Sequence, residues 1–183
     1  MIMSINDIIE NPGEWRNWAF AALPLIPANL KKAVEAVGDE KMFAKAVKGL
    51  DHIDKGWLAE EMAMRQFSKE GYARLASKLK SDQGIDLILA KTAKNGDIEE
   101  LLFVEAKFSS EGRFRLSTTS HGEQMSKEWL AEKLRLMARS DDPEVRETAR
   151  KIREYLNNGG KPGTSGYLLD GCGDVRSVPI KTP

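Results

Sequence analysis

Three charged residues occupy positions where an apolar core is expected. Asp86 opens the apolar run 84–92, and Glu105 and Lys107 stand two residues apart in the apolar run 98–108. Residues two apart in a strand lie on the same face, and a carboxylate buried there is costly without compensation. A divalent cation held by Asp86, Glu105 and a backbone carbonyl would compensate it, because Mg²⁺ binds one or two carboxylates together with waters and phosphate oxygens. Lys107 would then face a metal-bound water or developing negative charge.

The strands that must position these residues are predicted to form a hairpin. The dipeptide Asn95-Gly96 separates the two apolar runs, and Asn-Gly between β-rich runs is the strongest short-range hairpin signal. A hairpin makes the two runs neighbouring strands, so we expect Asp86 to lie close to Glu105.

A third carboxylate is expected from the preceding helix. Residues 56–71 have the spacing of an amphipathic helix. Glu60 falls on the apolar face of this helix, on one stripe with Trp57, Met64 and Phe67. A charge on a buried stripe needs a partner in the core, and the cation site is the natural one.

Each of these residues also has a purely structural interpretation. Glu105 and Lys107 alone fit an exposed cross-strand pair on an edge strand. Asp86 alone fits a turn, and Glu60 alone fits a solvent-facing helix position. Their order along the chain favours the site: a helical Glu, then Gly-x-Asp at the start of a strand, then Glu-x-Lys at the end of the next strand.

This order resembles the PD-(D/E)xK nuclease superfamily, which has the restriction-endonuclease-like fold. Gly-Ile-Asp at 84–86 and Val-Glu-Ala-Lys at 104–107 carry the resemblance, and Gly-Trp-Leu-Ala-Glu at 56–60 is similar to the first core helix of that superfamily. Ile85 stands where the superfamily usually has Pro. The resemblance covers about residues 56–135.

A second stretch is similar to the nuclease domains of bacterial polymorphic toxins. Residues 122–129 contain Gln124, Met125 and Ser126 followed by Trp129, which resembles a Gln-Met-Ser-x-x-Trp segment of contact-dependent inhibition, Rhs and secreted-effector toxins. Met125 and Trp129 follow helical spacing, so we expect them in the core and not against a nucleic-acid base.

The resemblance implies a role for each site residue. Asp86 and Glu105 would bind one or two Mg²⁺ or Mn²⁺ ions, which activate water and stabilise the charged phosphate. Lys107 would orient the attacking water or neutralise charge. Glu60 would complete the metal shell directly or through water, and Gln124 would sit at the mouth of the site or, alternatively, bond backbone at a helix start.

Basic residues near the site are candidates for contacts with nucleic acid. Arg113 and Arg115 alternate with apolar residues just after the second strand and suit phosphate contacts. Lys78 and Lys80 belong to the most basic stretch of the chain, residues 65–80. Both groups also fit ordinary solvated faces.

The implied function is a metal-dependent endonuclease that hydrolyses phosphodiester bonds, with DNA favoured over RNA. An antibacterial toxin domain with a cognate immunity protein fits the second resemblance, and it would act in the cytoplasm after delivery from a neighbouring cell. The alternatives are a tRNA-cleaving toxin on the same fold, a restriction or repair nuclease, a binding module with structural carboxylates, and an enzyme with one carboxylate as general base.

Composition excludes several other classes. The 183 residues contain 28 basic and 28 acidic side chains, so a generally basic nucleic-acid coat is not expected. His52, His121 and Cys172 are too few ligands for a structural zinc site or a disulfide. No apolar run reaches the length of a membrane span, and the start lacks the pattern of a signal peptide.

We therefore expect an α/β fold with a mixed central β-sheet flanked by helices. Residues 1–50 are expected to form a helical N-terminal extension, and residues 51–183 the nuclease-like domain. Asp54 is the expected N-cap of the 56–71 helix. The remaining expected elements are helices within 28–50 with a break near Gly38, helices at 122–139 and 142–156, and late strands at the sheet edge at 165–170 and 174–180.

Overall fold

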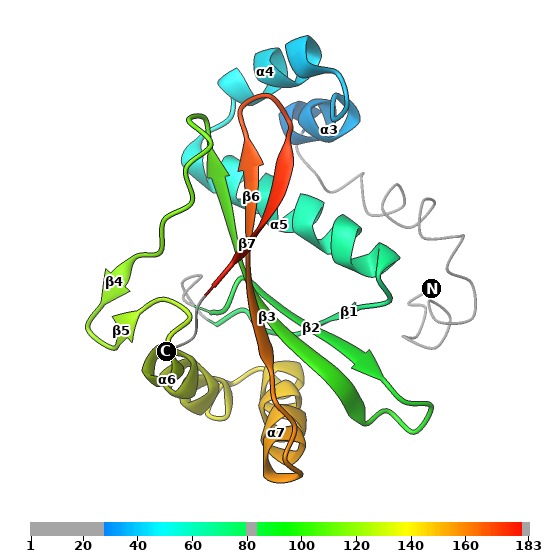
Figure 1. The fold of residues 1–183 in the computed structure, drawn as a ribbon, viewed down its shortest axis with the longest axis vertical. Coiled ribbons are helices and arrows are strands. Elements are labelled where there is room, and N and C mark those ends of the chain that lie inside the picture. Colours follow the sequence, from blue (N-terminus) through cyan, green and yellow to red (C-terminus); the bar gives the residue numbers. More distant parts are fainter. Residues whose placement is uncertain (1–27, 80–83, 181–183) are drawn as a thin grey trace.

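The structure is a computed structural model that describes residues 28–79 and 84–180. A mixed five-stranded sheet lies at its centre, in the order β1-β2-β3-β6-β7 (Figure 1). Neighbouring strands are antiparallel except β3 and β6, which are parallel. The expected mixed α/β architecture is confirmed. The strands are β1 (Ala73–Leu75), β2 (Leu87–Thr92), β3 (Ile98–Ser109), β6 (Gly163–Asp170) and β7 (Val175–Pro179).

The predicted hairpin is present as β2 and β3. Gly96 adopts a positive φ of 87° in the connecting turn, a conformation that suits glycine. The late strands were expected at the sheet edge, but only β7 lies there. β6 pairs with the other side of β3 along its last eight residues, so β3 is an interior strand. The alternative of an exposed edge pair for Glu105 and Lys107 is therefore wrong.

Five helices are described, and they differ from the expected bounds mainly at their starts. Asp51, and not Asp54, caps α5: its Oδ1 accepts a hydrogen bond of 2.8 Å from the Asp54 N–H. Residues 118–123, in part expected to be helical, instead form the two-stranded sheet of β4 (Thr118–Thr119) and β5 (Gly122–Glu123). The helices are α3 (Ala28–Glu35), α4 (Glu40–Lys48), α5 (His52–Lys69), α6 (Lys127–Met137) and α7 (Pro143–Asn157).

The sheet separates two hydrophobic cores. Val104 and Ala106 of β3 face the core that contains α3, α4 and α5, whereas Leu101 and Phe103 face the core with α6 and α7. Figure 1 shows α3 and α4 at one end of the molecule and α6 and α7 at the other. Residues 28–50 thus share their core with the sheet.

Several expectations concern other parts of the chain. Met125 and Trp129 are buried in the core around α6, as predicted. The first 27 residues of the expected N-terminal extension lie outside the described residues, and so does Lys80. No described helix has the length and apolar character that crossing a membrane requires.

Candidate active site

The site lies where β2 begins and its pairing with β3 ends. The last paired residues are Leu87 and Val104, and β3 continues alone on this side while β6 accompanies it on the other. The Ala106 N–H would otherwise lack a strand partner, and a buried N–H needs an acceptor. Asp86 Oδ2 accepts that hydrogen bond at 3.0 Å. Asp86 therefore supplies the hydrogen-bond acceptor that a neighbouring strand would otherwise supply. It lies one residue before the first paired residue of β2 and beside Glu105.

Glu105 is the most buried ionisable group of the site. The residue is 1% exposed on an interior strand, and its Oε1 accepts a hydrogen bond of 2.5 Å from Lys107 Nζ. Burial, and then the negative charge of Asp86, raise the pKa of Glu105 to about 7, although Lys107 and Gln124 oppose the rise. Desolvation therefore dominates over pairing, as expected for a carboxylate in a core.

Lys107 lies on the same face of β3 as Glu105, and its side chain is 30% exposed. Gln124 reaches it from another part of the chain: Gln124 Oε1 accepts from the Ser117 N–H at 2.9 Å and lies 3.5 Å from Lys107 Nζ. Met125 follows with a positive φ of 68°. This backbone conformation is unfavourable for a non-glycine residue, and burial of the Met125 side chain offsets it.

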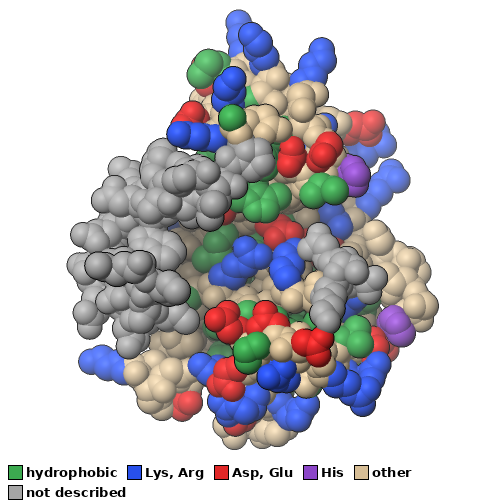
Figure 2. Space-filling model, turned by 180° about the vertical axis from the view of Figure 1, so that it is seen from behind, with side chains coloured by type: hydrophobic (Ala, Val, Ile, Leu, Met, Phe, Trp, Pro, Cys, Tyr) green, Lys and Arg blue, Asp and Glu red, His purple; other side chains and the backbone are tan. Residues whose placement is uncertain are grey.

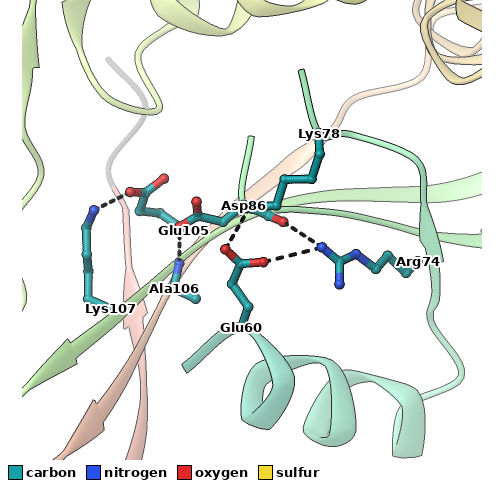
Figure 3. Close-up of polar contacts among 7 residues, drawn as sticks. All are labelled: Glu60, Arg74, Lys78, Asp86, Glu105, Ala106 and Lys107. Atoms are coloured by element: carbon teal, nitrogen blue, oxygen red, sulfur yellow. Dashed lines mark hydrogen bonds and ion pairs between the residues drawn. The ribbon is translucent and has the colours of Figure 1, made fainter. Parts of the chain in front are cut away.

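Glu60 approaches the same region from α5 but contacts cations (Figure 3). Its Oε1 accepts from Lys78 Nζ at 2.7 Å, and its Oε2 lies 3.3 Å from an Arg74 guanidinium nitrogen. Burial raises the pKa of Glu60, Lys78 opposes this, and the charge of Asp86 adds to the rise. Arg74 also donates to the Asp86 backbone carbonyl at 3.4 Å. Arg74 thus connects the Glu60 carboxylate to Asp86, the residue before β2, and Lys78 pairs with the same carboxylate.

Asp86 and Glu105 are suitable ligands for Mg²⁺ or Mn²⁺. Both supply carboxylate oxygens, which hard cations prefer, and their mutual repulsion is relieved by a shared cation. Within residues 28–79 and 84–180, no three His, Cys, Asp or Glu side chains form a metal-binding group. A magnesium site needs only one or two carboxylates. Glu60 as a third ligand stays a prediction.

A cavity of about 850 Å³ opens beside these residues. Asp86 and Lys107 line it together with Glu60, Arg74 and Lys78. Figure 2 shows the reverse face of the molecule, where Lys and Arg side chains gather in the middle with acidic side chains above and below them. The cavity is also lined by residues that the sequence did not single out for the site: His52, Ile53, Lys55, Gly56, Trp57, Ala106 and Phe108.

A second hollow of about 390 Å³ also borders Lys107. Arg113 and Arg115 line it, and both are exposed. Arg113 forms an ion pair of 3.6 Å with Glu111. The two arginines that were expected to contact nucleic acid thus lie next to the candidate catalytic lysine, while Lys78 lines the larger cavity.

Arg74 is a site residue that sequence reasoning missed. The basic stretch 65–80 contains it, but nothing in that stretch distinguishes it from Lys78 or from solvent-facing cations. Its contacts with Glu60 and with the Asp86 carbonyl come from the packing of α5 against β1 and β2.

Comparisons with family models, with curated proteins and with solved structures find no match for this chain.

Proposed function

We propose that the chain is a divalent-metal-dependent endonuclease that hydrolyses phosphodiester bonds and that its mixed sheet is a restriction-endonuclease-like core. One observation carries the proposal. Asp86, Glu105 and Lys107 meet at the end of the β2–β3 pairing, next to a cavity lined by basic side chains. Two carboxylates and a lysine beside a space lined by cations suit the hydrolysis of an anionic ester.

Asp86 and Glu105 would hold the metal. A divalent cation bound there supplies Lewis-acid stabilisation of the negative charge that develops on the phosphate. The Asp86 carboxylate is held in place by the Ala106 N–H, so its position is fixed before substrate arrives. A preorganised ligand of this kind avoids a reorganisation cost during the reaction.

Lys107 would orient the attacking water and neutralise charge on the phosphate. Its ammonium is fixed by Glu105 and lies near Gln124 Oε1. It borders both hollows, so a phosphate that passes between them comes near it. Gln124 is a positioning residue in this scheme, because it contacts Lys107, Glu105 and the Ser117 backbone.

A cleavage assay tests the proposal. Supercoiled plasmid and total tRNA are incubated separately with the protein in Mg²⁺, in Mn²⁺ and in EDTA. We expect metal-dependent loss of the plasmid, and a decrease in rate of about a hundredfold or more for Glu105→Gln and Lys107→Ala. Glu99→Gln and Lys94→Ala are matched controls, because both residues are exposed on the same hairpin.

The outcomes separate the alternatives. Discrete tRNA fragments with intact plasmid would move the substrate to RNA and retain the site. Absence of any cleavage by folded protein would contradict the nuclease and favour the binding module. Cleavage that persists in EDTA would favour general-base chemistry without a metal.

The toxin assignment is a further part of the proposal, with a cognate immunity protein as partner and the cytoplasm as the place of action. It is supported by the likeness of residues 122–129 to toxin nuclease domains and by the location of Gln124 beside Lys107. Induced expression in bacterial cytoplasm should arrest growth, whereas the Glu105→Gln variant should not. Equal growth with both proteins would contradict a toxin but not a nuclease.

A further inference from the structure

The larger cavity has features that hydrolysis itself does not need. Trp57 of α5 and Phe108 of β3 line it, and both aromatic side chains are only partly buried. Proteins that bind single strands combine cations that follow the backbone with aromatic rings on which bases stack. The charged residues that line this cavity, among those described, are the cations Lys55, Arg74, Lys78 and Lys107 and the carboxylates Glu60 and Asp86.

The two hollows are adjacent, because Lys107 and Phe108 line both. The smaller hollow adds the exposed cations Arg113 and Arg115. A chain of phosphates that enters the larger cavity can therefore cross Lys107 and continue along the arginines. We call this path, from the Trp57 cavity across Lys107 to Arg115, the binding track.

The volume of the larger cavity favours unpaired nucleotides. A volume of about 850 Å³ is that of a ligand-sized cavity. A base in a duplex is stacked and paired, and it must leave the helix before it can enter such a space. An unpaired nucleotide can place its base against an aromatic ring without that cost.

Trp57 is the better stacking partner of the two aromatic residues. Lys55 Nζ lies 5.7 Å from the centre of the Phe108 ring, so a cation already lies against that ring. No cation is placed in this way against Trp57 among the described residues.

We propose that the binding track takes nucleic acid with unpaired nucleotides, one base stacked on Trp57 and the flanking phosphates held by Arg113 and Arg115. This rests on the proposed function, since it assigns a substrate class to the same site. The shared chemistry is a single-stranded phosphodiester chain, and DNA and RNA are separated by the experiment.

Binding is measured by fluorescence anisotropy in EDTA, which removes the divalent cation that the proposed cleavage requires. The probes are a labelled single-stranded 20-mer of DNA, the same sequence as RNA, and the DNA as a duplex. We expect tighter binding of the single strands than of the duplex, and about tenfold weaker single-strand binding for Trp57→Leu. Tyr155→Leu, which removes a half-buried aromatic residue on α7, is the control and should bind as the unchanged protein does.

A second variant at Trp57 separates loss of the aromatic ring from misfolding of Trp57→Leu. Trp57→Phe keeps a ring and should restore most of the single-strand affinity. The unchanged protein should lose tryptophan emission when the single strand is added, and Trp57→Phe should lose less.

The two arginines are tested by the salt dependence of binding. The double variant Arg113→Ser with Arg115→Ser should lower the slope of log affinity against log salt concentration by about 1.4 for the single strand, since each phosphate contributes about 0.7. The double variant Arg139→Ser with Arg153→Ser is the charge-matched control.

The possible failures are distinguishable. Equal or tighter duplex binding that is unaffected by Trp57→Leu, together with metal-dependent plasmid cleavage, would overturn the track and leave the nuclease intact. If neither nucleic acid binds and neither is cleaved, the nuclease proposal falls as well. If the track is supported, tighter binding of the DNA or of the RNA single strand decides which of the two is the substrate.

Discussion

Replacement of Glu105 by Gln isolates the effect of one buried charge on stability. In the metal-free protein, burial and the charge of Asp86 raise the pKa of Glu105 from its ordinary 4.5 to about 7. The folded state therefore binds this proton more tightly than the unfolded chain. Stability that is present below pH 4.5 is lost as the pH rises through about 7. At 1.36 kcal/mol for each pH unit, the loss is about 3 kcal/mol.

Urea unfolding between pH 4 and pH 8 in EDTA measures this loss. The free energy of unfolding of the unchanged protein, minus that of Glu105→Gln, should fall by about 3 kcal/mol over this range. The variant should be the more stable protein at pH 8, because Gln has nearly the same shape and its side-chain oxygen can still accept from Lys107. For the exposed Glu99→Gln, the same difference should stay within about 0.5 kcal/mol.

Addition of Mg²⁺ at pH 8 completes the test. A cation that binds only the folded protein raises the free energy of unfolding with its concentration, and it should do so for the unchanged protein far more than for Glu105→Gln. A difference between the two proteins that does not change with pH would refute the reasoning from burial and charge. Equal stabilisation of both proteins by Mg²⁺ would refute Glu105 as a metal ligand.

Substitutions at three further positions test the geometry through urea unfolding. Asp86→Ala leaves the Ala106 N–H without its acceptor and should cost about 1 to 3 kcal/mol, whereas Asp86→Asn keeps an acceptor oxygen and should cost less; equal losses would contradict the role of this hydrogen bond. Gly84→Ala should destabilise by about 1 to 3 kcal/mol, because its Cβ would lie 2.3 Å from the Ser77 carbonyl oxygen. Gly56→Ala, inside α5, should instead stabilise the folded protein by about 0.5 to 1 kcal/mol, because nothing lies within 4 Å of the added Cβ. A decrease in the free energy of unfolding would contradict this expectation.

Local features of the fold could be predicted from the sequence because neighbouring residues determine them. Asn95-Gly96 forms the turn between β2 and β3, and Gly38 separates α3 from α4. Asp142 accepts from the Glu144 N–H and caps α7, whose first residue is Pro143, as predicted. Such turns and caps depend on backbone conformations and hydrogen bonds within a few residues.

The cap of α5 shows where local reasoning failed. Both Asp51 and Asp54 are good capping residues, and the sequence contains the same local signal at each. Because Asp51 is the cap, the helix begins at His52, and Trp57 and Glu60 lie within one regular helix that packs on the sheet. Packing of the whole helix decides between two caps of similar local free energy.

The alternation along the hairpin determined that Glu105 and Lys107 share a face and that Asp86 lies beside Glu105. The sequence could not determine that β6 pairs in parallel with β3 and buries Glu105 within the sheet. Nor could it bring Gln124 to Lys107, or Glu60 to Arg74 and Lys78. These contacts join segments 14 to about 60 residues apart. Their geometry follows from the burial of whole apolar faces of the helices and the sheet against one another, and no short stretch of sequence specifies that packing.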